Sequence, residues 1–219
     1  MPKPTSGRLI PKPTSGRGAL VELVVIVALA VGLALGIQAF IVKPYQIPSG
    51  SMIPTLEKGQ RVLVNRLSHR LGGDPQIGDV IVFHPPVNAV PAEQARGDAL
   101  PECAVGEHPD EPCPEAGTEM ADTNFIKRVV AGPGDTLSIH DGHPVVNGVE
   151  AEEDFIRPCS GGNGCDLPEQ ITIPPDHYFM MGDNRGFSDD SRFWGPIPRD
   201  WMIGEAFATY WPPNRIGLL

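Results

Sequence analysis

The chain has 219 residues and a formal net charge of −10 at pH 7, and glycine and proline number 25 each. A proline content about twice the average excludes a mainly helical bundle and favours short strands joined by many turns. The negative charge argues against nucleic acid as a partner, because phosphate contacts need clustered lysine and arginine.

Charge and hydropathy divide the chain into three parts. Residues 1–17 carry four basic side chains and no acid, and their repeated PKPTSGR unit predicts a flexible, disordered tail. Residues 18–42 form an apolar run that only Glu22 and Gln38 interrupt, which is long enough for a transmembrane helix. The positive-inside rule places the tail in the cytoplasm. We therefore expect a single-pass protein of the plasma (inner) membrane, with residues 43–219 forming an acidic domain on the outer side.

A cleaved secretory signal peptide is the alternative to an uncleaved anchor. The apolar region of such a peptide is about 7–15 residues long and ends at a small-residue cleavage site. Here the run is longer and is followed by Lys43-Pro44-Tyr45, which is a poor cleavage context. The sequence therefore favours an anchor.

The outer domain reads as strands and turns in chain order. Alternating or β-branched runs predict strands in residues 61–68 and 78–86, three strands separated by turns in 124–149, a strand and turn in 171–184, and a closing strand at 202–211. Residues 88–122 hold nine acids and show little periodicity, so we expect an exposed acidic insertion there. Strands without intervening helices predict an antiparallel all-β domain.

All four cysteines lie beyond the apolar run, in a compartment where disulfides persist. Proximity pairs Cys159 with Cys165 and Cys103 with Cys113. Zinc is the alternative, but spacings of six and ten residues without a histidine pair are untypical of zinc sites. We therefore expect disulfides and no metal site.

Ser51 is the first candidate for chemistry. It lies in PSGSMIPT, where prolines on both sides restrict the backbone and Gly50 allows another chain to approach closely. Such a loop could present the hydroxyl to a substrate. Taken alone, an ordinary turn serine is the simpler interpretation.

Lys127 is the second candidate. In NFIKRVV, strand alternation places it on the same face as Phe125 and Val129, and an apolar environment lowers the pKa of a lysine. A neutral amine near pH 7 could act as a general base toward a serine hydroxyl. The alternative is a lysine whose amine extends to water along its apolar stem.

Residues 181–198, MGDNRGFSDDSRFWGPIP, concentrate acids, arginines and serines beside Phe193 and Trp194. This density predicts a partly buried hydrogen-bonded network next to an aromatic wall. A polar surface loop is the alternative interpretation.

Four motifs in order, PSGSMIPTL, GDVIVF, NFIKRVVAGPGD and GDNRGFSDDSRFWG, follow the N-terminal anchor. Together they resemble the type I signal peptidases (leader peptidases) of bacteria, over residues 47–211 with gaps. The resemblance implies a catalytic domain built from a coiled antiparallel sheet on the outer membrane surface. It also implies a serine/lysine dyad that needs no cofactor.

By resemblance, Ser51 corresponds to the nucleophile and Lys127 to the general base. Ser49 corresponds to the hydroxyl that forms the oxyanion hole together with the backbone N–H of Ser51. Ser188 corresponds to the serine that orients the lysine amine.

Two ion pairs, Asp190 with Arg192 and Asp183 with Arg128, correspond to those that hold the frame of the dyad. The implied substrate is a preprotein bound as an extended strand, with small Ala-x-Ala side chains in shallow pockets. Candidate residues for the substrate wall, for which ordinary core packing is an equal alternative, are Met52, Ile53, Val80 and Phe83.

The sequence departs from the family pattern at the 88–122 insertion, at the CSGGNGC loop, and in having one apolar span where larger members have two. None of these differences touches the dyad. The implied partners are preproteins and the phospholipid bilayer, with a secretion translocon as a further candidate.

Three rival functions remain. A self-cleaving repressor with a related dyad would carry a basic DNA-binding module, which this acidic chain lacks. A catalytically inactive protein that captures preproteins would share the anchor but would not cut. A metal-dependent or Ser-His-Asp hydrolase would need histidine spacings that are missing here.

Overall fold

The computed structural model describes residues 16–67, 72–89, 110–115, 117–159, 161 and 164–219. The chain divides into two compact units, one ending at Ala39 and the other comprising Phe40–Leu219. The first contains a single helix, and the second contains all the β-strands.

Helix α1 spans Gly16–Phe40, and its segment Gly18–Gly36 has a mean hydropathy of 2.6. Among the described residues it is the one helix that is long and apolar enough to cross a membrane. The predicted helix, 18–42, runs two residues too far, because Val42 already pairs with Asn65 in a sheet. Pro44 prevents the helix from continuing to residue 44, because its ring would clash with the carbonyl of residue 40 in a continuous helix.

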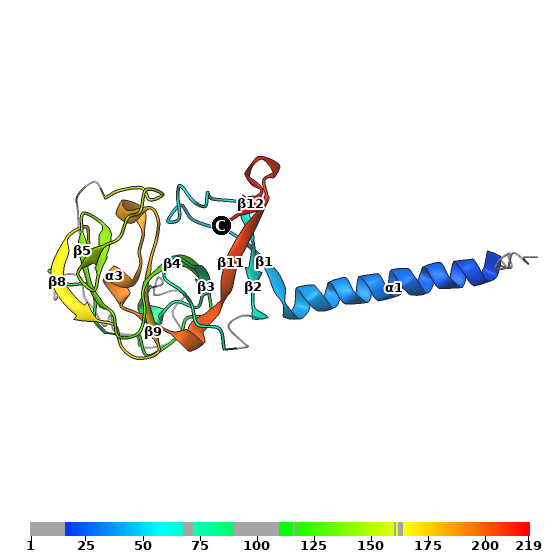
Figure 1. The fold of residues 1–219 in the computed structure, drawn as a ribbon, viewed down its shortest axis with the longest axis horizontal. Helices are drawn as coiled ribbons and strands as arrows, with labels where there is room; N and C mark the ends of the chain where they lie inside the picture. The colour runs from blue at the N-terminus through cyan, green and yellow to red at the C-terminus, as the bar shows by residue number, and fades with distance from the viewer. Residues whose placement is uncertain (1–15, 68–71, 90–109, 116, 160, 162–163) are drawn as a thin grey trace, which may run out of the picture. The chain divides into compact units, whose positions relative to one another are not determined.

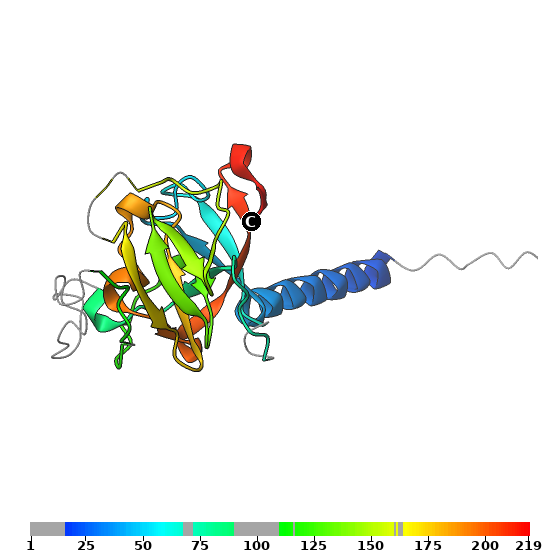
Figure 2. The same ribbon diagram turned by 60° about the vertical axis from the view of Figure 1, so that its left-hand side comes forward.

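The β-domain is all-β and antiparallel, as expected (Figures 1 and 2). Its large, strongly curled sheet has the order β1-β2-β11-β3-β4-β9-β10, with β12 beside β11, and a small sheet has the order β7-β6-β5-β8. The strands are β1 Val42–Gln46, β2 Arg61–Asn65, β3 Val80–Phe83, β4 Phe125–Ala131, β5 Thr136–His140, β6 His143–Val146, β7 Val149–Glu150, β8 Leu167–Thr172, β9 His177–Met181, β10 Ile197–Pro198, β11 Met202–Trp211 and β12 Gly217–Leu218. A short helix, α3, spans Ser191–Trp194.

Most predicted strands are present. The 124–149 segment contains the three predicted strands, β4, β5 and β6, and a short fourth strand, β7, begins at its end. Strand β11 has the predicted bounds, 202–211. The 171–184 segment was expected to hold one strand, but it contains the end of β8 and all of β9. Strand β1 was not predicted.

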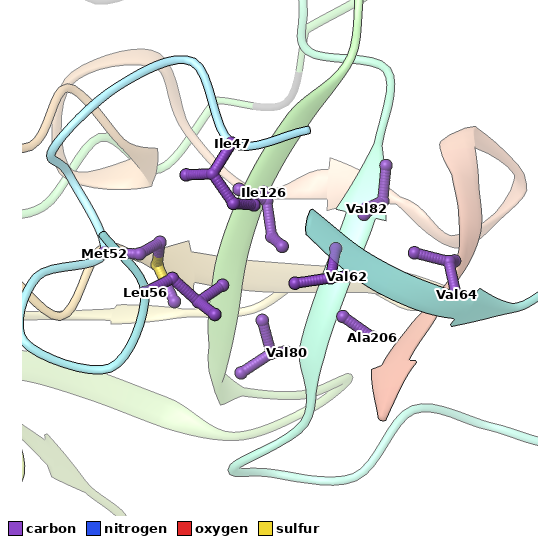
Figure 3. Packing of buried hydrophobic residues seen from close by; sticks show 9 residues of the cluster. All are labelled: Ile47, Met52, Leu56, Val62, Val64, Val80, Val82, Ile126 and Ala206. Atoms are coloured by element: carbon purple, nitrogen blue, oxygen red, sulfur yellow. The ribbon is translucent and has the colours of Figure 1, made fainter. Parts of the chain in front are cut away.

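Three apolar clusters form the core of the β-domain. The first packs the loop after β1 against β2, β3 and β4, and Figure 3 shows its nine residues. The second lies around Phe83 and Trp194, whose ring centroids are 6.0 Å apart. The third joins the small sheet to β4 and β9. Both faces of the large sheet are therefore covered, and all four residues of β3 are buried.

The acidic insertion leaves and rejoins the β-domain at one place. Its central residues 90–109 and residue 116 lie outside the described part of the chain. At its ends, the Ala121 amide donates to Pro85 O over 2.8 Å, and the Val87 amide donates to Glu119 O over 3.0 Å. Val87 and Ala121 are buried and pack against Phe125. The two ends of the insertion are therefore packed onto the β-domain, whereas an exposed loop was expected.

Candidate active site

The loop that follows β1 holds Ser51. Two backbone hydrogen bonds close the base of this loop: the Ile47 amide donates to Gln60 O, and the Gly59 amide donates to Ile47 O. Ile47 is also buried in the core. Asn184 ties the tip down, because its amide donates to Ser51 O over 2.9 Å and its side chain donates to Gly50 O over 3.0 Å. Ser51 is 8% exposed, and its Oγ lies 3.3 Å from Ser49 Oγ.

Lys127 lies in the middle of β4, where it pairs with Ile81 of β3. Its side chain is 4% exposed, and Nζ donates a hydrogen bond to Ser188 Oγ over 2.8 Å. Burial lowers the pKa of Lys127 from 10.5 to about 8, although the negative charges of Asp190 and Asp189 oppose this shift. The amine is thus held by one hydroxyl and is deprotonated far more easily than an exposed lysine.

Ser51 and Lys127 line the same cavity, which has a volume of about 600 Å³. Its other described lining residues are Pro48, Ser49, Thr123, Asn124, Phe125, Ile126, Phe187 and Asp189. The structure therefore brings the serine loop and the lysine strand to one solvent-accessible space.

The expected pair Asp183–Arg128 lies beside the cavity and joins β4 to the segment after β9. Arg128 donates from Nε to Asp183 Oδ1 over 2.8 Å and from Nη2 to Oδ2 over 2.7 Å. Asp183 is fully buried, and it also accepts from Thr55 Oγ1 of the serine loop over 2.5 Å. This bidentate ion pair, together with the hydrogen bond from Thr55, holds the serine loop against β4 at the residue next to Lys127.

The second expected pair, Asp190–Arg192, is buried at the start of α3. Arg192 donates to Asp190 from Nε and Nη2, over 2.8 and 3.0 Å, and Asp190 also accepts from the Gly182 amide over 3.0 Å. Burial favours the neutral acid, but Arg192 outweighs this effect and holds the pKa of Asp190 below its ordinary value. The remaining N–H groups of Arg192 bind the carbonyls of Gly164 and Arg185.

Arg185 and Gly182 are parts of the site that sequence reasoning did not assign. Arg185 is 1% exposed, and its Nη1 lies 2.6 Å from Glu153 Oε2. A Cβ on Gly182 would lie 2.2 Å from Ser188 Oγ and 2.5 Å from Ser51 O. Only glycine lets these two chain segments approach so closely. The crowded polar motif around residues 181–192 was the available signal for both residues.

None of the four proposed wall residues is among the described residues that line the cavity. Met52 and Val80 are buried in the first core cluster, and Phe83 is buried in the second. Ile53 is half-buried, and it is not among the residues that line the cavity. Apolar clusters cover both faces of the large sheet. The apolar side chains of β3 therefore pack into these clusters and do not line this cavity. The apolar lining comes from Pro48, Phe125, Ile126 and Phe187 instead.

Cys159 and Cys165 form a disulfide with their Cα atoms 5.8 Å apart. Between them lies Gly164, whose carbonyl accepts a hydrogen bond from Arg192 over 2.9 Å, so the loop supports the buried ion pair. Cys113 is buried, whereas Cys103, its proposed partner, lies outside the described residues. In the part of the chain that the structure describes, no three His, Cys, Asp or Glu side chains are placed to bind a metal ion.

Comparison with known proteins gives consistent matches over most of the chain. A family described as "Signal peptidase, peptidase S26" matches residues 20–211. A signal peptidase I of Leptolyngbya laminosa is 37% identical over 91% of this chain and 84% of its own length. A signal peptidase I of Pseudomonas aeruginosa is 32% identical over 85% of this chain and 72% of its own length. A crystal structure of a signal peptidase I from Enterococcus faecalis aligns at 24% identity with a TM-score of 0.35, over 60% of this chain and 96% of that chain.

Proposed function

The chain belongs to the signal peptidase family, peptidase S26, and from this premise we propose that Ser51 and Lys127 form the dyad that cleaves its substrates. Membership makes the protein a serine endopeptidase that cleaves signal peptides. One observation carries the dyad: a buried lysine with a pKa of about 8 lines the same cavity as a serine in a restrained loop.

The proposed reaction has two steps. Neutral Lys127 takes the proton of Ser51 as Oγ attacks the carbonyl carbon of the scissile bond, and the lysine then protonates the leaving amine. Lys127, neutral again, next deprotonates a water that attacks the acyl carbonyl carbon. The bond to Ser51 Oγ then breaks, Oγ takes a proton back from the Lys127 ammonium, and the signal peptide leaves with a new carboxyl terminus. Ser188 holds Nζ in position during both proton transfers, which agrees with their separation of 2.8 Å.

The oxyanion formed in each step needs hydrogen-bond donors. The backbone N–H of Ser51 and the hydroxyl of Ser49, whose Oγ lies 3.3 Å from Ser51 Oγ, are the proposed donors. Such donors stabilise a tetrahedral intermediate by about 3–4 kcal/mol. All of these groups belong to the chain or to water, and the proposed steps use no metal or cofactor.

The proposed substrate is a membrane-bound preprotein with an Ala-x-Ala cleavage site. The proposed location is the outer surface of the plasma membrane, with α1 as the single anchor and residues 1–17 in the cytoplasm. Ser51 follows Val42 by nine residues, and a chain of that length spans at most about 30 Å. Anchoring enzyme and preprotein in one bilayer would raise their effective concentration.

Cleavage of a preprotein with an Ala-x-Ala site by the detergent-solubilised full chain tests this proposal. We expect the wild type to cut after the second alanine, and Ser51→Ala and Lys127→Met to be inactive while keeping the wild-type circular dichroism spectrum. Lys58→Met, which removes an exposed lysine, is the matched control and should cut normally. Binding without cleavage by the wild type would favour a preprotein-capturing protein, and full activity of Lys127→Met would contradict the lysine base.

A further inference from the structure

The cavity of the candidate active site continues into a smaller one. The smaller cavity has a volume of about 160 Å³, and the two share the lining residues Pro48 and 123–126. Tyr45 and Val82 line only the smaller cavity, whereas Ser51, Lys127, Phe187 and Asp189 line only the larger one. The combined space therefore extends on both sides of Ser51 and Lys127, with β1 at one end and residues 187–189 at the other.

Chain connectivity orients a substrate in this space. Strand β1, which supplies Tyr45, begins two residues after the end of α1 at Phe40. The part of a preprotein that is anchored in the same bilayer would thus approach along β1. The residues that follow the scissile bond, which become the start of the mature protein, would leave past Phe187 and Asp189.

Local backbone geometry places Phe187 and Asp189 on the same side. Ser188 is extended, with φ −128° and ψ 123°, so its two neighbours project to the side opposite its own side chain. Ser188 is buried against Lys127, while Phe187 is 74% exposed and Asp189 is exposed as well. An aromatic ring and a carboxylate are thereby presented side by side at the rim of the cavity.

We propose that Phe187 and Asp189 form a subsite for a basic side chain of the mature protein just after the scissile bond. This inference rests on the proposed function. The ring offers a face to the aliphatic stem and to the cation, and the carboxylate offers a charge partner. No other feature of the described cavity lining would favour a cation at this end.

The groups that surround Asp189 are Asp190, Lys127 and Arg192, which act on its charge, and Trp194, whose side chain contributes a hydrogen bond to it. Lys127 is the other titratable group among the described lining residues, and the proposed mechanism uses its neutral form. Arg192 is buried and is bound by Asp190 and by backbone carbonyls. Asp190 is itself bound by Arg192 and by the Gly182 amide.

The test uses the full chain and preproteins that differ only in one mature residue. Lysine, glutamine or glutamate is placed in turn at the first and at the second residue after the cleavage site, and kcat/KM is measured at low salt. At one of these positions we expect the wild type to prefer lysine over glutamine about threefold, the size of an exposed ion pair, with glutamate poorer still. In Asp189→Asn and in Phe187→Ala the lysine preference should shrink toward one.

Each preference is a ratio between substrates of one variant, so any change in the proton affinity of Lys127 cancels. Glu169→Gln removes an exposed acid away from the cavity, and it should keep the wild-type ratio. Equal cleavage of all substrates by the wild type, or an unchanged preference in Asp189→Asn, would overturn the subsite and leave the proposed function standing. Failure to cut any of them would overturn both.

Discussion

In the proposed dyad, the position of Lys127 would set the working pH of the site. The side chain is 4% exposed, and the nearest charge partners, Asp190 and Asp189, restore only part of the stability that its ammonium form loses on burial. The pKa of Lys127 therefore falls to about 8 rather than staying at 10.5. At pH 7 a useful fraction of the amine is already neutral.

From this value we expect a kcat/KM that rises with pH below about 8 and levels off above it. The base must be neutral, so activity on the acid limb should fall about tenfold per pH unit. A pH–rate profile of the full chain in detergent measures this. An acid limb centred near 10, or no acid limb at all, would contradict burial as the source of the reactive amine.

Sequence alone singled out Ser51 and Lys127, which line one cavity in the structure, but it did not identify the apolar residues that line that cavity. Strand alternation put Lys127 on a face with apolar neighbours, and the motif resemblance linked it with Ser51 and Ser188. Met52, Val80 and Phe83 could not be distinguished from cavity residues by sequence, because they are apolar and lie within the motifs. Their burial depends on clusters that form on both faces of the curled sheet, and alternation within one strand does not show which face opens to a cavity.

At the scale of elements, the turn that precedes α3 depends on a buried ion pair. Asp190→Ala leaves Arg192 without its partner, and removing one member of a buried pair costs about 3–5 kcal/mol. We expect that loss in the free energy of unfolding at neutral pH, measured by urea denaturation. Because the folded-state pKa of Asp190 is lowered, the pair stabilises at pH values above the usual aspartate pKa and less as the pH falls through its folded value. The variant's deficit should thus shrink in acid.

The control for this prediction is a pair of the same residue types on the surface. Asp74, 66% exposed, lies 2.8 Å from Arg199, and Asp74→Ala should cost no more than about 1 kcal/mol. Equal losses at positions 74 and 190 would show that burial does not set the strength of the Asp190–Arg192 pair.

The contact between the serine loop and the 182–188 segment depends on the absence of a side chain at Gly182. Gly182→Ala would force apart Ser188 Oγ and Ser51 O, which lie 2.2 and 2.5 Å from the added Cβ. A displacement of about 1 Å in a catalytic group lowers activity on the order of a hundredfold, and we expect a loss of that size in kcat. Gly132→Ala is the matched control, because its added Cβ meets no atom closer than 3.7 Å. Equal activity of the two variants would contradict the steric argument.

Element prediction from the sequence succeeded where strands are apolar and failed at the edges of the large sheet. Strand β11 alternates between buried and half-buried residues as far as an irregularity after Ala206, and it was predicted with its observed bounds. Strand β1, VKPYQ, is polar and contains a proline, and such residues are tolerated at a sheet edge. It is held by backbone pairing with β2, a non-local contact that local sequence patterns do not show.

At the scale of the whole molecule, the distribution of charge predicts which side of the membrane each part occupies. The tail carries four basic residues and no acid, whereas the chain from Lys43 onward has 13 basic and 26 acidic residues. Basic flanks remain in the cytoplasm during insertion. An active site on the outer side would also meet the preprotein cleavage site on the face where exported proteins emerge.

This orientation predicts opposite labelling of two introduced cysteines in intact spheroplasts. Glu152→Cys, at an exposed position of the β-domain, should react with a membrane-impermeant maleimide at once, whereas Ser6→Cys in the tail should react only after the membrane is permeabilised. The parent chain, whose Cys159 and Cys165 are joined in a disulfide, provides the background of the assay. Immediate labelling of both positions would mean that the apolar run does not span the bilayer. Labelling of Ser6→Cys alone would reverse the orientation and place the candidate active site in the cytoplasm, out of reach of a translocated cleavage site.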